Sequence, residues 1–472
     1  MADPGTATTE SPVTAGVVQD GLPTPRRHCA TLAIMATLVL VVLDGAIANV
    51  ALPTIAASLR VSPASSVWVV NGYQVALVMA LLPCAALGES LGLRRVFTGG
   101  VAVFTAASLL CSLAPSLPWL VAARFVQGLG GAAVVALGIG LMRFTYPHRL
   151  LGAVIGWNAT MIALSGAAGP TIGSAILAAS SWPWLFAVNL PVGAVVLVAA
   201  LALPQPPGTG RKLDLLSAAL NATAFASLVL CVDRAASAPK LAAWLLAAAV
   251  VSFVALVRRE MPRQAPLVPL DLLRSRPFRI SVIASVCCFA GHMASYIALP
   301  FYLQHNLGQD VIATGLYMAP WPLVVAVAGP VSGRLADRVS NGLLCAAGGA
   351  ILAMGLALSA FWPIIQGNLW PLVFFLMLSG FGFGIFQTPN NRNMLLSAPR
   401  ERSGAAGGMQ GTARLLGQTA GSVIMALLFT LAPPAAAPRV GLAVSAVLAL
   451  AGGLVSAMRI DREAARSNAP GV

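Results

Sequence analysis

One acidic residue, Asp44, lies about midway along a long apolar stretch that runs from residue 29 to residue 52. A charged side chain at the centre of an apolar segment is costly, so by default it faces a cavity and has a function. A carboxylate held partly away from water can bind and release a proton near neutral pH. We therefore predict that Asp44 couples proton movement to another process. The alternative is an Asp that joins helices by hydrogen-bonding a neighbouring backbone group.

A second chemical candidate is Arg124, which lies three residues before Gln127 in another apolar segment. At that spacing the two side chains share one face of a helix. A buried guanidinium stays protonated, so we expect Arg124 to bias a neighbouring acid or to bind backbone carbonyls. A purely structural anchor is the other interpretation.

Further polar and aromatic side chains interrupt the apolar segments and are predicted to line a substrate cavity. Aromatic rings attract lipophilic cations, whereas amides in lipid also join helices to each other, so roughly half of the amides are expected to contact a substrate. The imidazole of His292 could titrate or could only bond a neighbouring helix. The predicted cavity residues are Asn71, Gln74, Gln127, Asn158, His292, Tyr296, Gln387, Asn390, Asn391 and Arg414, with Trp68, Tyr73, Trp157, Trp321 and Phe386 as further candidates.

The segments that must position these residues are those of a membrane protein. Hydrophobic residues make up 58% of the chain and charged residues 9%, whereas an ordinary soluble domain is about a quarter charged. A membrane-spanning helix needs roughly 20 mostly apolar residues. We predict fourteen spans, near 29–52, 65–87, 96–114, 117–142, 150–178, 183–203, 215–232, 241–257, 280–303, 311–332, 342–363, 369–391, 403–431 and 438–458.

The basic residues predict the orientation of these spans, because Lys and Arg accumulate in cytoplasmic loops. One side of the membrane receives nearly all of them, and the other side holds only Arg60, Arg234, Lys240 and Arg439. Both termini are therefore predicted to be cytoplasmic, in a bacterial-type inner membrane. The net charge of +14 does not indicate nucleic-acid binding, because the basic residues occupy short gaps and form no polar patch.

Weak internal repeats predict two related halves, as is common in transporters. Residues 51–53 recur as 298–300, 169–174 recur as 417–422, and Glu89 corresponds to Asp337, all at an offset of about 248 residues. Each half then holds six helices, and two helices are inserted between them. The predicted division is 1–27 as a disordered cytoplasmic tail, 28–205 as the N-terminal bundle, 206–262 as linker and inserted helices, 263–460 as the C-terminal bundle and 461–472 as a second tail.

Several other function classes are disfavoured. An ATP-driven pump needs a phosphate-binding loop, and the sequence G-x-x-x-x-G-K-[ST] is absent. The four histidines and seven cysteines lack metal-ligand spacing, so neither a metal, a cofactor nor an enzymatic centre is expected. The repeat with Gly and Pro interruptions favours alternating access over a channel.

Five motifs carry a resemblance to a known family. They are LDGAIANVALPTI (43–55), RFVQGLGGAA (124–133), SGAAGPTIGS (165–174), WPWLFAVNLPVG (182–193) and GRLADR (333–338). In this order they resemble the major facilitator superfamily, specifically its fourteen-spanner drug:proton antiporters of the EmrB/QacA type. The resemblance covers about residues 25–460 and implies an all-α fold of two six-helix bundles plus two inserted helices.

The resemblance also implies roles for particular residues. It implies that Arg124 takes part in proton transfer, and that a segment of the fifth span limits leakage while the halves alternate; the residues of this antiporter motif are Gly166, Gly169, Pro170 and Gly173. The cytoplasmic gating motif is Gly333, Asp337 and Arg338 in the second half, and Glu89, Gly92, Arg94 and Arg95 in the first. The first-half copy departs from the family pattern, because Ser90 and Leu93 stand where basic residues are usual. An ordinary solvated loop pair is the alternative for Asp337 and Arg338.

These observations predict a proton-coupled secondary transporter that exports small lipophilic compounds, as in multidrug efflux. Cations are candidate substrates because an unprotonated Asp44 attracts positive charge. The alternative is proton-coupled uptake or export of a specific metabolite. The expected partners are the substrate, protons and membrane lipids, with no nucleic acid, and the protein is expected to be a monomer that needs only the proton gradient.

Overall fold

A computed structural model of the chain describes residues 21–205, 214–234, 238–261, 270–363, 368–398 and 403–459. Every regular element in these ranges is a helix. The first half contains α1 (Thr24–Leu59), α2 (Pro63–Ser66), α3 (Trp68–Leu91), α4 (Leu93–Ser112), α5 (Leu117–Thr145), α6 (His148–Ala179), α7 (Trp184–Ala187), α8 (Asn189–Ala199) and η1 (Ala200–Ala202). Next come α9 (Leu215–Arg234), α10 (Pro239–Glu260) and η2 (Leu270–Arg274). The second half contains α11 (Arg276–Phe301), η3 (Tyr302–Asn306), α12 (Val311–Met318), α13 (Pro320–Leu335), α14 (Asn341–Phe361), α15 (Trp370–Leu396), α16 (Ser403–Leu431) and α17 (Ala437–Ala457).

Twelve helical segments in the described residues are long and apolar enough to cross a membrane. The helices α6 and α9 lie at two further predicted spans, but their apolar stretches are shorter, Leu164–Ala179 and Leu215–Cys231. The first half of α6 carries polar residues such as Arg149 and Asn158, which lower its mean hydropathy. The all-helical membrane class is thus confirmed, and the count of fourteen spans stays a prediction.

The predicted N-terminal tail, residues 1–27, overlaps the start of α1. Residues 24–27 were expected to belong to it, but they form the first turn of α1. Pro25 lies in that first turn, where the fixed φ of proline favours a helix start and its missing N–H is not needed. The predicted tails at 1–20 and 461–472 lie outside the described residues, as does the linker at 206–213.

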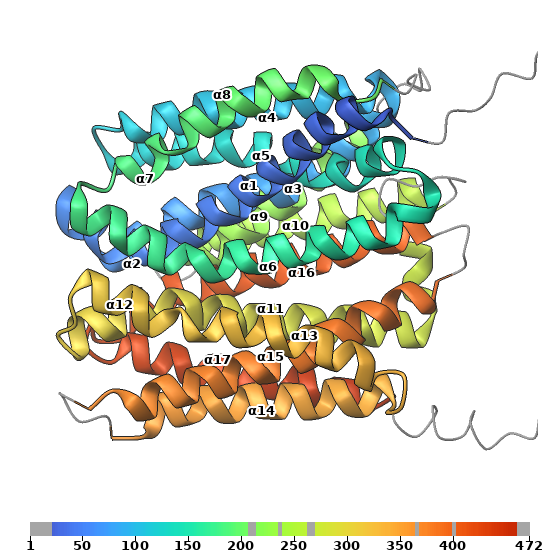
Figure 1. The fold of residues 1–472 in the computed structure, drawn as a ribbon. Helices are drawn as coiled ribbons and strands as arrows, with labels where there is room; N and C mark the ends of the chain where they lie inside the picture. The colour runs from blue at the N-terminus through green and yellow to red at the C-terminus, as the bar shows by residue number, and fades with distance from the viewer. Residues whose placement is uncertain are drawn as a thin grey trace, which may run out of the picture.

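The helices pack as two bundles that run side by side (Figure 1). Helices α1 to α8 contact each other in the first bundle, and α11 to α17 contact each other in the second. Between them, α9 and α10 pack together, and α9 also contacts α3 and α16. We call the end where α1 begins the basic end, because Arg94, Arg95 and Arg338 lie there, and the other the opposite end.

Small residues allow the closest helix contacts in the first bundle. A Cβ at Gly130 in α5 would lie 2.6 Å from the backbone nitrogen of Phe104 in α4, and a Cβ at Gly128 would meet the carbonyl oxygen of Tyr73 in α3. Side chains at these positions would force the helices apart. The glycines therefore hold Arg124, one turn earlier on α5, and the adjacent Gln127 close to both neighbouring helices.

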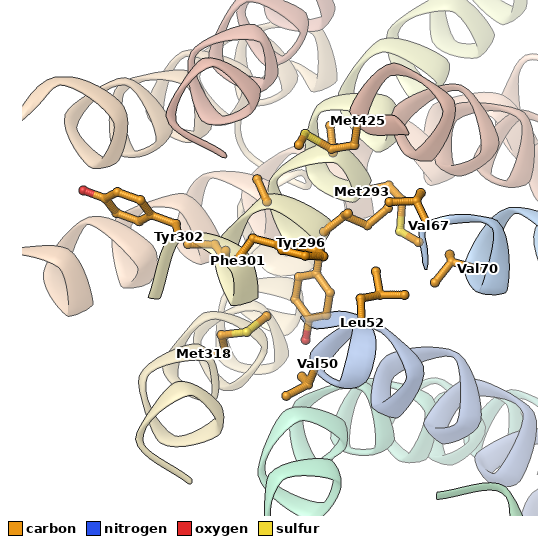
Figure 2. Close-up of a cluster of buried hydrophobic side chains, with 14 of the residues drawn as sticks. Val50, Leu52, Val67, Val70, Met293, Tyr296, Phe301, Tyr302, Met318 and Met425 are labelled. Carbon is orange, nitrogen blue, oxygen red and sulfur yellow. The ribbon is translucent and has the colours of Figure 1, made fainter. Parts of the chain in front are cut away.

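Hydrophobic side chains join the two bundles most extensively at the opposite end. Figure 2 shows the middle of this cluster, where Val50 and Leu52 of α1, with Val67, lie close to Met293 and Tyr296 of α11. At the basic end, a second cluster is built from the first bundle, with Leu415 of α16 its one fully buried member from the second half among the described residues. The opposite end is therefore the closed end in this structure.

Candidate functional site

The carboxylate of Asp44, in the middle of α1, accepts hydrogen bonds from side chains on two other helices. Arg124 of α5 donates from Nη1 to Oδ2 and forms an ion pair with Asp44. Gln127 donates from Nε2 to Oδ1 over 3.0 Å, and Asn189 of α8 donates from Nδ2 to the same oxygen over 2.7 Å. Asp44 is 2% exposed and Arg124 is 0% exposed, so this ion pair is closed to solvent.

The guanidinium of Arg124 is held on further sides by the first bundle. Its Nε donates to the backbone oxygen of Val69 in α3 over 3.1 Å. Its central carbon lies 4.3 Å from the centre of the Tyr73 ring and 5.5 Å from that of Phe186, which is within the range of a cation–π contact. Arg124 therefore contacts both kinds of partner considered from the sequence, a neighbouring acid and a backbone carbonyl.

Ser108 of α4 completes the arrangement. Its Oγ accepts from Nε2 of Gln127 over 2.8 Å and from Nδ2 of Asn189 over 3.3 Å, and it donates to the backbone oxygen of Phe104. We call Asp44, Ser108, Arg124, Gln127 and Asn189 the ion-pair network. All of the network's contacts to the carboxylate come from donors, and Gln127 belongs to this network rather than to an open cavity.

The second bundle holds an aromatic cluster of His292, Tyr296, Trp321 and Phe383. The imidazole of His292 stacks on the ring of Phe383, with centroids 4.4 Å apart and planes 12° apart. The rings of Trp321 and Tyr296 lie 5.3 Å and 5.4 Å from it. Among the described residues, Nδ1 of His292 and Nε1 of Trp321 are buried without a hydrogen-bond partner. Two orphaned polar atoms within a set of rings suit a flat molecule that supplies hydrogen-bonding groups.

Close backbone packing positions this cluster. A Cβ at Gly380 in α15 would meet the carbonyl oxygen of Trp321, so α13 and α15 touch directly beside that tryptophan. On α11, a Cβ at Gly291 would lie 2.6 Å from the backbone oxygen of Ser445 in α17. The neighbouring residue His292 contacts Trp321 of α13 and Phe383 of α15.

Three other predicted cavity residues are polar groups with an unpaired atom. Within the described residues, Asn71 of α3 and Asn158 of α6 are buried and their Oδ1 atoms have no partner. Arg414 of α16 is half-buried, and its Nε also has no partner. Gln74, one turn from Asn71 on α3, is buried as well. Asn71, Asn158 and Arg414 thus keep hydrogen-bonding capacity for a ligand.

The remaining predicted cavity residues lie on α15, toward the basic end. Asn390 donates to the backbone oxygen of Ser281 over 3.1 Å and accepts at 3.5 Å from Arg459, two residues after the end of α17. These contacts join α11, α15 and the segment that follows α17 within the second bundle, so Asn390 packs these elements together. Gln387 and Asn391 are half-buried on the same helix.

The gating motif contributes an ion pair within the second bundle. Asp337 pairs with Arg392 of α15 over 2.7 Å, so this ion pair does not join the two bundles. Arg338 is exposed, as are Glu89 and Arg95, while Arg94 and Gly333 are half-buried. Gly92 ends α3 with a φ of 100°, a conformation that glycine adopts without strain.

The antiporter motif lies where the two bundles meet. A Cβ at Gly169 in α6 would meet the side chain of Ala46 in α1, and Gly173 packs beside Ile47. From the other bundle, a Cβ at Gly315 in α12 would collide with Oγ of Ser174 and lie 2.7 Å from the backbone oxygen of Pro170. Gly166 differs, because a Cβ there would meet nothing within 4 Å. The motif thus packs between α1 and α12, and its first glycine faces open space.

Sequence reasoning missed Asn189 and Ser108. Asn189 stands in the motif of residues 182–193, where a polar residue in an apolar run is a usable signal. Ser108 gives no such signal, because serine is common in membrane helices and usually bonds its own helix. In the part of the chain that the structure describes, no three His, Cys, Asp or Glu side chains lie close enough to hold a metal ion.

Two bundles of apolar helices, with a buried ion pair in one and an aromatic cluster in the other, define a multi-pass membrane protein built to move a small molecule. Residues 34–422 match the Major Facilitator Superfamily, and the chain belongs to that family. Members of this family are transporters rather than enzymes, and they bind small-molecule substrates.

Individual relatives support this assignment. The chain is 44% identical to the "Uncharacterized transporter YebQ" of Escherichia coli (strain K12) over 461 residues, covering 96% of this chain and 99% of that one. It is 30% identical to the "Multidrug resistance protein Stp" of Mycobacterium tuberculosis over 400 residues, covering 82% of this chain and 73% of the relative. Its fold is similar to that of a bacterial homolog of the human lysosomal transporter Spinster, with a TM-score of 0.67 at 15% identity, over 94% of this chain and 99% of the other.

Proposed function

We propose that this protein is a proton-coupled exporter of small lipophilic compounds, in which protonation of Asp44 drives alternating access. The observation that carries the proposal is the ion-pair network, which holds an ionised carboxylate in the middle of α1 by three donors from other helices. The similarity to a multidrug resistance protein supports export of lipophilic compounds.

Protonation would change this network physically. A neutral carboxyl loses its ionic attraction to Arg124, and one of its oxygens becomes a donor that faces the donor groups of Gln127 and Asn189. The helices α1, α5 and α8 would then be held less tightly to each other. Because the antiporter motif packs against α1 at Gly169 and Gly173, a shift of α1 would reach the contact between the bundles.

The orientation follows from the basic end, which we assign to the cytoplasm of a bacterial inner membrane. The closed opposite end then corresponds to a cytoplasm-facing state. In this state a compound enters from the cytoplasm and its rings stack in the aromatic cluster. Protonation of Asp44 from outside and release of the proton inside complete the cycle with export.

Reconstituted vesicles test this function. Protein inserted with a known orientation should move a lipophilic dye against its gradient when a pH step is imposed, and Asp44→Asn should abolish the response to the step. Dye movement that ignores the pH step in the unaltered protein would disprove proton coupling. Transport of one metabolite and of none of a panel of unrelated lipophilic compounds would instead favour the alternative, a specific metabolite transporter.

A further inference from the structure

Arg414 lies on the face of α16 that is turned toward the space between the bundles. On one side of it, Gly411 packs near Leu81 of α3, with 3.6 Å between a Cβ at that position and the side chain. On the other side, a Cβ at Gly417 would lie 2.7 Å from the backbone oxygen of Val286 in α11. With 100° per residue on a helix, position 414 falls between these two contact directions, so its side chain lies between a helix of each bundle.

The guanidinium of Arg414 has no counter-ion in the described residues. Within the described ranges this half-buried side chain makes neither a hydrogen bond nor an ion pair, and its Nε is buried without a partner. A guanidinium stays protonated even when buried. An unpaired charge in a membrane interior is costly, so by default it marks a functional site.

The acidic residues do not offset this charge. In the part of the chain that the structure describes, Asp44 is the acid in the middle of a spanning helix, and it is engaged by Arg124, Gln127 and Asn189. Other described acids, such as Glu89, Asp310 and Asp337, lie at helix ends. The interior between the bundles therefore carries a net positive charge from Arg414.

The internal repeat pairs position 414 with a position of the first bundle that has space beside it. Its equivalent at the offset of 248 residues is Gly166 of α6, where a Cβ would meet nothing within 4 Å. The two equivalent helices thus present an open position in one bundle and an unpaired Arg in the other.

We propose that Arg414 binds an anionic group of the substrate, so that the transported compounds are lipophilic aromatic acids. This inference rests on the proposed export function and names its substrate class. The aromatic cluster holds the rings. Because Gly417 and Gly421 of α16 contact Val286 and Ala290 of α11, Arg414 is level with about residue 283, and His292 lies roughly 13 Å further along the axis. One drug-sized molecule with an acidic group reaches both.

Two xanthene dyes of similar ring structure test the charge preference: fluorescein, which is anionic, and rhodamine 6G, which is cationic. Binding to purified full-length protein in detergent is measured by fluorescence anisotropy, without any gradient. The unaltered protein should bind fluorescein more tightly than rhodamine 6G, and Arg414→Gln should weaken fluorescein binding on the order of tenfold or more. Arg414→Lys should retain much of the affinity. Arg279→Gln, which removes an exposed charge at the end of α11, should change nothing.

The inference is overturned if fluorescein fails to bind, if rhodamine 6G binds better, or if Arg414→Gln binds fluorescein as the unaltered protein does. If Arg414→Gln fails to fold, Arg414→Lys is the test. It keeps the positive charge, so it should still bind fluorescein more tightly than rhodamine 6G, and loss of that preference overturns the inference. The proposed function fails separately, when fluorescein binds but its movement in vesicles ignores the pH step. Preference for the cationic dye together with pH-driven export would disprove the anion-binding role of Arg414 and leave the proposed export function standing.

Discussion

Asn189 donates from its Nδ2 to Oδ1 of Asp44 over 2.7 Å, and so ties the first turn of α8 to the middle of α1. The same nitrogen lies 3.3 Å from Oγ of Ser108 on α4. One amide group therefore links three helices at the residue proposed to carry the proton. Its neighbours Val188 and Leu190 are apolar, so the polar side chain has no other evident reason to lie in this segment.

Asn189→Ala should loosen the ion-pair network while leaving the Asp44–Arg124 pair in place. The carboxylate would lose one of its three donors, at a cost of about 1–3 kcal/mol in the free energy of unfolding, and pH-driven transport should fall. Thermal unfolding in detergent and transport in vesicles measure the two effects. Asn71→Ala is the matched control, because the Oδ1 of that buried amide has no partner among the described residues, and it should be destabilised less. Equal losses of stability in the two variants would contradict the role of Asn189.

Substitutions of Asp44 and Arg124 should not be additive. Asp44→Asn alone strands a buried cation and Arg124→Gln alone strands a buried anion, and each should cost about 3–5 kcal/mol of stability. The double variant leaves no charge unpaired and should recover much of that loss. Transport should stay abolished in all three, because the proton carrier or its partner is missing. A double-mutant cycle from thermal unfolding checks this, and additive losses would show that the two charges do not depend on each other.

Hydropathy and basic residues allowed the helices to be predicted closely, because a run of about 20 apolar residues has few other stable forms. Helical spacing also placed Arg124 and Gln127 on one face, and both contact Asp44. That both residues bind Asp44 could not be predicted, because Asp44 is 80 residues from Arg124 in sequence and no local sequence pattern indicates which helices touch. Asn390 shows the same gap: only the fold, which brings α15 beside the residues that follow α17, reveals that Asn390 bonds Arg459.

Gly315→Leu should prevent the opposite end from closing. The added side chain would collide with Ser174 and the backbone at Pro170, and so force α12 away from α6. In a chain without its native cysteines, Leu52→Cys lies in the closed hydrophobic cluster and should react slowly with a membrane-impermeant maleimide. Adding Gly315→Leu should speed that reaction several-fold and stop transport. The control is Gly99→Leu, at an exposed position where a Cβ meets nothing within 4 Å, and it should leave the maleimide reaction rate unchanged. If Gly315→Leu also leaves that rate unchanged, closure does not depend on the contact between α12 and α6.

The pair of Asp337 and Arg392 should affect transport more than stability. Both side chains are largely exposed, at 65% and 40%, and an exposed ion pair is worth less than about 1 kcal/mol. Asp337→Asn should therefore leave the unfolding temperature almost unchanged while it slows transport. Exchanging the charges, as Asp337→Arg with Arg392→Asp, should restore transport if the pair itself matters. No recovery in the exchanged variant would mean that Asp337 acts through another group.

Trp321→Phe should weaken substrate binding without destabilising the protein. The indole N–H of Trp321 is buried and unpaired among the described residues, so the empty protein bears the cost of a donor without an acceptor. Phenylalanine keeps a ring near His292 and Tyr296 but removes that donor. Removal of the unpaired donor stabilises the empty protein and the smaller ring offsets part of that gain, so the free energy of unfolding without substrate should stay level or rise by about 1 kcal/mol. Affinity for a substrate that accepts the hydrogen bond should fall roughly tenfold. Trp362→Phe, a half-exposed tryptophan near Phe375, is the control. If Trp321→Phe destabilises the empty protein and leaves substrate affinity unchanged, then the indole serves packing, and the orphaned donor is not part of a binding site.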